Sequence, residues 1–137
     1  MKQRRQFIRK LGGLTALLAA GIPGKAQMGK SEEPEGNFVH VVFFWLINDA
    51  EETRKKFLSE LRKFIDNVDL IKTKHIGTPA DTDRPVIDNS WSFSLILSFN
   101  SKKEHDLYQE HPLHKAFIEN ASSLWEKVQV YDSVKTS

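Results

Sequence analysis

Histidine and tyrosine side chains are the groups in this sequence best suited to chemistry near neutral pH. Residues 108–114 read Tyr-Gln-Glu-His-Pro-Leu-His, which brings Tyr108, His111 and His114 into one short segment. An imidazole can take a proton from a carbon beside a carbonyl group, and a phenol can stabilise the oxyanion that then develops. A purely structural role for these residues is the alternative. The two histidines flank a predicted helix start, where they can complete the helix cap and pack against a sheet.

The histidines are also candidate metal ligands, because neutral imidazole is the commonest such ligand in proteins. Their spacing does not indicate a site, since no two stand four residues apart on one predicted helix and no carboxylate recurs at a fixed offset. The sequence has no cysteine, which excludes thiolate zinc sites, disulfides and cysteine nucleophiles. We therefore predict no metal and no cofactor. The five histidines are His40, His75, His105, His111 and His114.

The charge of the chain changes along its length. The 20 basic and 18 acidic residues give a net charge of +2, but residues 1–26 hold six bases and no acid. Without that segment 14 bases face 18 acids, a net charge of −4. No basic stripe with interleaved aromatic residues is left, which argues against a nucleic-acid partner.

Residues 1–26 have the pattern of an export signal, with a charged start, an apolar run over 11–22 and small residues before Gln27. Residues 3–9, Gln-Arg-Arg-Gln-Phe-Ile-Arg, resemble a twin-arginine signal; an ordinary secretion signal is the alternative. The apolar run is shorter than the roughly 20 residues that span a bilayer, so we expect membrane contact only during export. The protein is predicted to be periplasmic or otherwise exported from a bacterial cell, with residues 27–37 as a linker.

Apolar periodicity and capping signals predict the elements of the folded part. Residues 38–46 are apolar on both alternating faces, which is typical of a strand that is covered on both sides. Asn48 and Asp49 with the glutamates that follow predict a helix start, and Ser101 with Glu104 forms a capping box. Pro112 suits the first turn of another helix. We predict strands over 38–46, 68–76, 91–99 and 127–134, helices over 49–66, 101–108 and 112–124, and a long loop over 77–89.

The predicted order βαββααβ is that of a ferredoxin-like α+β fold, an antiparallel four-stranded sheet with its helices on one face. The opposite face then carries apolar side chains with no cover of its own. A second copy of the chain is the simplest cover for such a face. We therefore predict a homodimer with a barrel-like interior.

Three segments of the sequence resemble the stress-responsive α/β-barrel (Dabb) family. They are the strand at 39–44, the segment 108–117 and the closing Val-Tyr-Asp at 130–132. The resemblance covers residues 38–134 and implies a dimeric α/β barrel. The family includes stress-induced plant proteins, a plant polyketide cyclase and bacterial members without an assigned activity. In the cyclase type, the resemblance places catalytic residues at Tyr108 and His114 and a pocket histidine at His40.

Three functions follow as hypotheses. In the first, the exported homodimer binds a small apolar or aromatic molecule between helices and sheet. In the second, the protein is a cyclase-like or lyase-like enzyme with His114 as base and Tyr108 as oxyanion partner. In the third, it is a stress-response module without a ligand, and His40 is a core histidine. The expected substrate-binding residues are His40, Val42, Phe44, His111 and Phe117.

Overall fold

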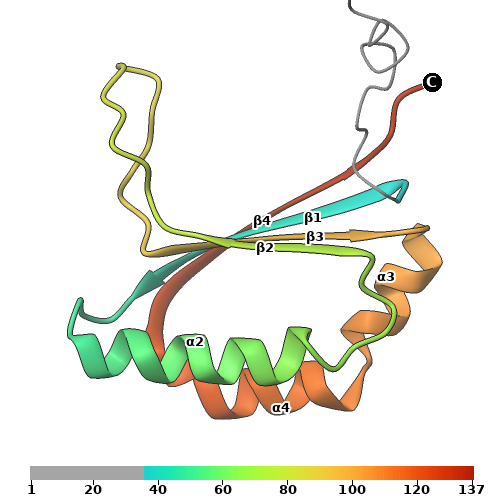
Figure 1. Cartoon of the computed structure of the whole chain (residues 1–137), viewed down its shortest axis with the longest axis horizontal. Helices are drawn as coiled ribbons and strands as arrows, with labels where there is room; N and C mark the ends of the chain where they lie inside the picture. Colours follow the sequence, from blue (N-terminus) through green and yellow to red (C-terminus); the bar gives the residue numbers. More distant parts are fainter. Residues whose placement is uncertain (1–35) are drawn as a thin grey trace, which may run out of the picture. The chain divides into compact units, whose positions relative to one another are not determined.

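The computed structural model describes residues 36–137 of the chain. The predicted signal at 1–26, and the predicted linker apart from its last two residues, lie outside this part. No helix within residues 36–137 is long and apolar enough to cross a membrane. The elements, shown in Figure 1, are β1 (Phe38–Leu46), α2 (Glu51–Ile65), β2 (Thr73–Gly77), β3 (Phe93–Phe99), α3 (Lys102–Gln109), α4 (Pro112–Ala121), the 3-10 turn η2 (Ser122–Leu124) and β4 (Trp125–Val134).

The four strands form one antiparallel sheet in the order β2-β3-β1-β4. The first strand of the chain therefore lies in the interior of the sheet, and the last strand forms an edge. The helices lie on one side of the sheet, and the loop between β2 and β3 extends towards the other side (Figure 1). This arrangement confirms the predicted ferredoxin-like α+β fold.

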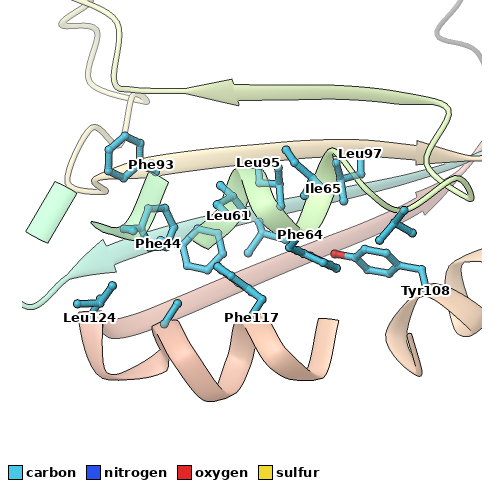
Figure 2. Close-up of a cluster of buried hydrophobic side chains, with 14 of the residues drawn as sticks. Phe44, Leu61, Phe64, Ile65, Phe93, Leu95, Leu97, Tyr108, Phe117 and Leu124 are labelled. Atoms are coloured by element: carbon cyan, nitrogen blue, oxygen red, sulfur yellow. The ribbon is translucent and has the colours of Figure 1, made fainter. Parts of the chain in front are cut away.

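Strand β1 shows why its sequence is apolar at nearly every position. Phe38, His40, Val42, Phe44 and Leu46 are buried, whereas the residues between them are half-buried. Side chains alternate between the two faces of a strand, so the buried set points towards the helices. It packs there with apolar residues of β3 and of the helices, among them Leu61, Phe64, Leu95 and Phe117 (Figure 2).

Several element boundaries differ from the prediction, most clearly the starts of α2, β2 and β3. Helix α2 begins after Ala50, which caps it without a side-chain hydrogen bond. The amide oxygen of Asn48 instead accepts a hydrogen bond from the Ala50 N–H. Strand β2 begins at Thr73 rather than at residue 68, because Val68 is buried in the turn that follows α2. The predicted loop at 77–89 is also longer, since β3 starts only at Phe93.

The helix starts before Tyr108 and His114 follow the prediction. The hydroxyl of Ser101 accepts a hydrogen bond from the Glu104 N–H and caps α3. Pro112 occupies the first turn of α4, and His111 is the residue that caps this helix. These two N-caps fix where α3 and α4 begin, and so help to position the segment that carries Tyr108 and His114 over the sheet.

Candidate functional site

A cavity of about 210 Å³ lies between the helix-covered face of the sheet and helices α3 and α4. Most of its wall is apolar and comes from the sheet and α4. The polar side chains are His40, Tyr108, Gln109 and His114. The apolar wall includes Val42, Phe44, Leu95, Phe117, Ile118, Val128 and Val130.

His40 and Asp132 form the central polar contact of the site. They are directly opposite each other in the antiparallel pairing of β1 with β4, so their side chains emerge on the same face. Nδ1 of His40 lies 2.5 Å from Oδ1 of Asp132. An ionised carboxylate can only accept, so Nδ1 carries the hydrogen and donates it. In a neutral ring Nε2 then keeps a free lone pair, and a free Nε2 can accept a proton or a hydrogen bond.

Helices α3 and α4 add Tyr108 and His114 to the same site. The rings of Tyr108 and His114 are 5.2 Å apart between centroids, and those of Tyr108 and His40 are 5.7 Å apart. Phe64 packs against both Tyr108 and His114 and holds their orientation. The hydroxyl of Tyr108 points towards Phe64 in the space between helices and sheet (Figure 2).

Burial controls the protonation of these groups. Desolvation raises the pKa of Tyr108, and the charge of Asp132 adds to this effect. Desolvation also lowers the pKa of His40, although its hydrogen bond to Asp132 opposes the shift. The pKa of His114 is lowered by burial and by the nearby His40 and His105. Near neutral pH the site therefore combines a phenol that can donate a hydrogen bond with neutral imidazoles that can accept a proton.

The structure brings together six of the predicted site residues and places one elsewhere. His40, Val42, Phe44, Tyr108, His114 and Phe117 line the cavity. His111 is not among the lining residues, and its Nδ1 instead accepts a hydrogen bond from the Leu113 N–H at the start of α4.

Sequence reasoning missed three residues in and around the site, Asp132, His105 and Gln109. Asp132 lies opposite His40, and His105 packs against the ring of His40 at 4.9 Å between centroids. Gln109 lines the cavity and lies 3.3 Å from His105 between their Nε2 atoms. The strand alternation that puts Val128 and Val130 on the inner face also indicates Asp132, but only once the register with β1 is known.

Comparison with known proteins identifies the family. The family model of the stress responsive A/B barrel domain, Dabb, matches residues 38–135, which is most of the chain. The chain belongs to the Dabb family. No curated protein matches its sequence.

Solved structures share the Dabb fold at low sequence identity. A Dabb family protein with a ferredoxin-like fold from Mesorhizobium loti is 23% identical with a TM-score of 0.63, covering 75% of this chain and 100% of its own. A dimeric protein of unknown function from Bacteroides fragilis is 20% identical with a TM-score of 0.57, covering 74% and 98%. The hydroxynitrile lyase of Passiflora edulis is 16% identical with a TM-score of 0.61, covering 75% and 96%. At these identities the similarity shows the fold.

Replacing Asp132 with asparagine tests the electrostatic role of the His40–Asp132 pair. The amide of D132N keeps an oxygen that can accept the hydrogen bond, but the negative charge is gone. The pKa of His40 should therefore fall below its value in the unchanged protein, because Asp132 is the group that raises it. Titration of the His40 ring signals by NMR measures this, with the exposed His75 as internal control. An unchanged or increased pKa of His40 would contradict the assignment.

The buried histidines also predict how stability depends on pH. Because the pKa values of His40 and His114 are lowered from 6.5, the unfolded chain binds more protons than the folded chain just below that pH. The free energy of unfolding should therefore decrease as the pH falls through about 6.5 towards the lowered pKa values. Urea unfolding between about pH 8 and about pH 5.5 measures this.

The variant H114Q should show a smaller decrease over this range, because one of the two titrating groups is removed. H75Q, which removes an exposed histidine of β2, is the matched control and should keep the full decrease. A stability that rises on acidification in the unchanged protein, or equal slopes in H114Q and H75Q, would show that His114 is not the buried neutral group described.

Proposed function

We propose that this Dabb protein binds a small apolar or aromatic molecule in the cavity beside His40, Tyr108 and His114. The observation that carries the proposal is the composition of the cavity wall, in which these polar groups interrupt an otherwise apolar surface. Ligand sites of this kind use apolar area for affinity and a few placed polar groups for orientation. A ligand with one oxygen among apolar atoms matches this wall.

The volume limits the size of the ligand. A dry apolar cavity of about 150 Å³ is sufficient to bind benzene. The present cavity of about 210 Å³ can therefore hold one aromatic ring with a small substituent, or an aliphatic chain of similar volume. Val128 and Val130 of the edge strand are 43% and 41% exposed, and they leave apolar surface at the cavity for a longer ligand to cover.

An enzymatic role is the second candidate, supported by the pairing of Tyr108 with His114. A neutral His114 can remove a proton from a carbon next to a carbonyl, while the phenol of Tyr108 donates a hydrogen bond to the developing oxyanion. A cyclase-like or lyase-like reaction needs both of these roles. The hydroxynitrile lyase with the same fold supports this candidate by analogy of fold alone.

We also propose that the protein is exported and acts as a homodimer. Export rests on the signal-like pattern of residues 1–26. The dimer rests on the sheet face away from the helices, where Val41 and Phe43 are half-buried, Ile96 is 38% exposed and Tyr131 is 61% exposed. A second copy covering this face would remove these apolar side chains from water. The dimeric protein of the same fold from Bacteroides fragilis supports this assembly.

Thermal shift measurements with a library of substituted benzenes, aromatic ketones and aliphatic aldehydes test the binding proposal. Selective binding to the folded protein raises the unfolding midpoint. The variants Y108F and H114L should lose most of the shift for ligands that contain oxygen and keep it for purely apolar ligands, because they remove hydrogen bonds rather than apolar area. A second measurement tests the enzymatic role. Compounds that bind, and that have a hydrogen on the carbon next to a carbonyl, are incubated with the protein in D₂O. Exchange of that hydrogen for deuterium that depends on His114 would indicate the enzymatic role.

The control for this experiment is H75Q, which lies outside the cavity and should retain every shift. If Y108F and H114L unfold several degrees earlier without ligand, Tyr108 and His114 have a structural role as well. If no compound raises the midpoint of the unchanged protein, the binding proposal is wrong, and the interpretation as a stress-response module without a ligand is favoured.

The dimer proposal is tested by placing a charge at the centre of the uncovered face. The variant I96K should be monomeric in light-scattering measurements, because a lysine buried between two apolar faces has no partner for its charge. L107K places the same charge on α3, where Leu107 is 53% exposed, and should stay dimeric. A monomeric unchanged protein, or an I96K dimer as tight as L107K, would rule out this interface.

A further inference from the structure

Three side chains with metal-binding atoms, each from a different element, converge around His40, which also lines the cavity. They are His40 of β1, His105 of α3 and Asp132 of β4, and one ligand atom from each lies within 4.8 Å of the others. We propose that His40, His105 and Asp132 bind a divalent transition-metal ion of the zinc type. This inference goes beyond the function proposed above and does not rest on it.

The donor set suits such an ion. Two imidazoles and one carboxylate, with further positions open to water, form a common ligand set for zinc and for non-haem iron. Ligands in these sites lie about 2.0–2.2 Å from the ion, so two of them are at most about 4.4 Å apart. Binding would require side-chain rotations that close the trio by less than about 1 Å and open the 2.5 Å contact between His40 and Asp132.

Neighbouring side chains hold the rings of His40 and His105 in place and keep water away from them. His40 and His105 are 5% and 7% exposed, and the ring of His105 stacks on Phe38 at 4.4 Å between centroids. Both rings are therefore largely withdrawn from water, and an imidazole binds a metal in its neutral form. The carboxylate of Asp132 is hydrogen-bonded to the ring of His40, which is neutral, so a bound cation would give this carboxylate a positively charged partner.

The groups around His105 resemble the hydrogen-bonding partners that support histidine ligands in known metal sites. Oδ1 of Asp106 lies 3.5 Å from Nδ1 of His105, and a carboxylate beside a ligating imidazole raises its basicity. Asp106 in turn forms an ion pair with Lys102 at 2.6 Å. Tyr108 and His114 stand outside the trio and stay available to a ligand in the cavity. An ion at this position would add a Lewis acid close to the cavity.

The experiment is a titration of the full chain, purified without a histidine tag and treated with a chelator, with Co²⁺ and with Zn²⁺. Visible absorption of Co²⁺ reports its coordination, and calorimetry with Zn²⁺ gives stoichiometry and affinity. We expect one ion per chain and an affinity that weakens as the pH falls, because protons compete for the two imidazoles. The variants H105L and D132N should each weaken binding at least about tenfold.

The matched control is H75Q, which removes a histidine of β2 outside the trio and should bind as the unchanged chain does. Circular dichroism shows which variants are folded. If H105L does not fold, the test uses D132N alone, because Asp132 is partly exposed and its substitution should not disturb the core. The proposal is overturned if millimolar Co²⁺ gives no protein-dependent absorption, or if folded D132N binds as tightly as H75Q. Thermal shifts caused by organic ligands are measured with chelator present. They test ligand binding in the cavity without metal, so the two proposals can fail independently.

Discussion

The site depends on the register in which β1 pairs with β4, because this register sets His40 opposite Asp132 on the face that the helices cover. A shift of one residue would turn every side chain of one strand to the other face and separate the pair. Apolar packing specifies the register, since the same shift would expose Val42 and Phe44. The polar centre of the site is therefore held in position by the hydrophobic core around it.

The cavity arises from the way the helices cover the sheet. Core residues of β1 and β3 pack directly against α2 and α4, whereas nearly all of edge strand β4 is exposed in the single chain. Polar groups meet at the end of the cavity near α3, which brings both Tyr108 and His105. Burial then keeps Tyr108, His40 and His114 uncharged near neutral pH, because it raises the pKa of the phenol and lowers the pKa of the two imidazoles.

Local signals in the sequence predicted most of the fold, and the resemblance to the Dabb family indicated about half of the polar groups that the structure places at the site. The alternation of β1, the capping box at Ser101 and the proline at the start of α4 each depend on neighbouring residues, and the structure confirms them. The start of α2 was predicted two residues too early, because the side chain of Asn48 accepts a hydrogen bond from the Ala50 N–H instead of capping the helix. Asp132 and His105 were missed because their proximity to His40 depends on strand register and on how α3 docks over β1, which no local spacing encodes. For the same reason, spacing along the chain gave no indication of a metal site.

The tautomer of His40 tests the central contact most directly. Long-range ¹H–¹⁵N correlation spectra of the histidine rings at neutral pH distinguish a protonated from an unprotonated nitrogen. The structure predicts a neutral His40 with hydrogen on Nδ1, donated to Asp132, and a bare Nε2. A hydrogen on Nε2 with Nδ1 bare, in the metal-free protein, would contradict the pairing on which this description of the site depends.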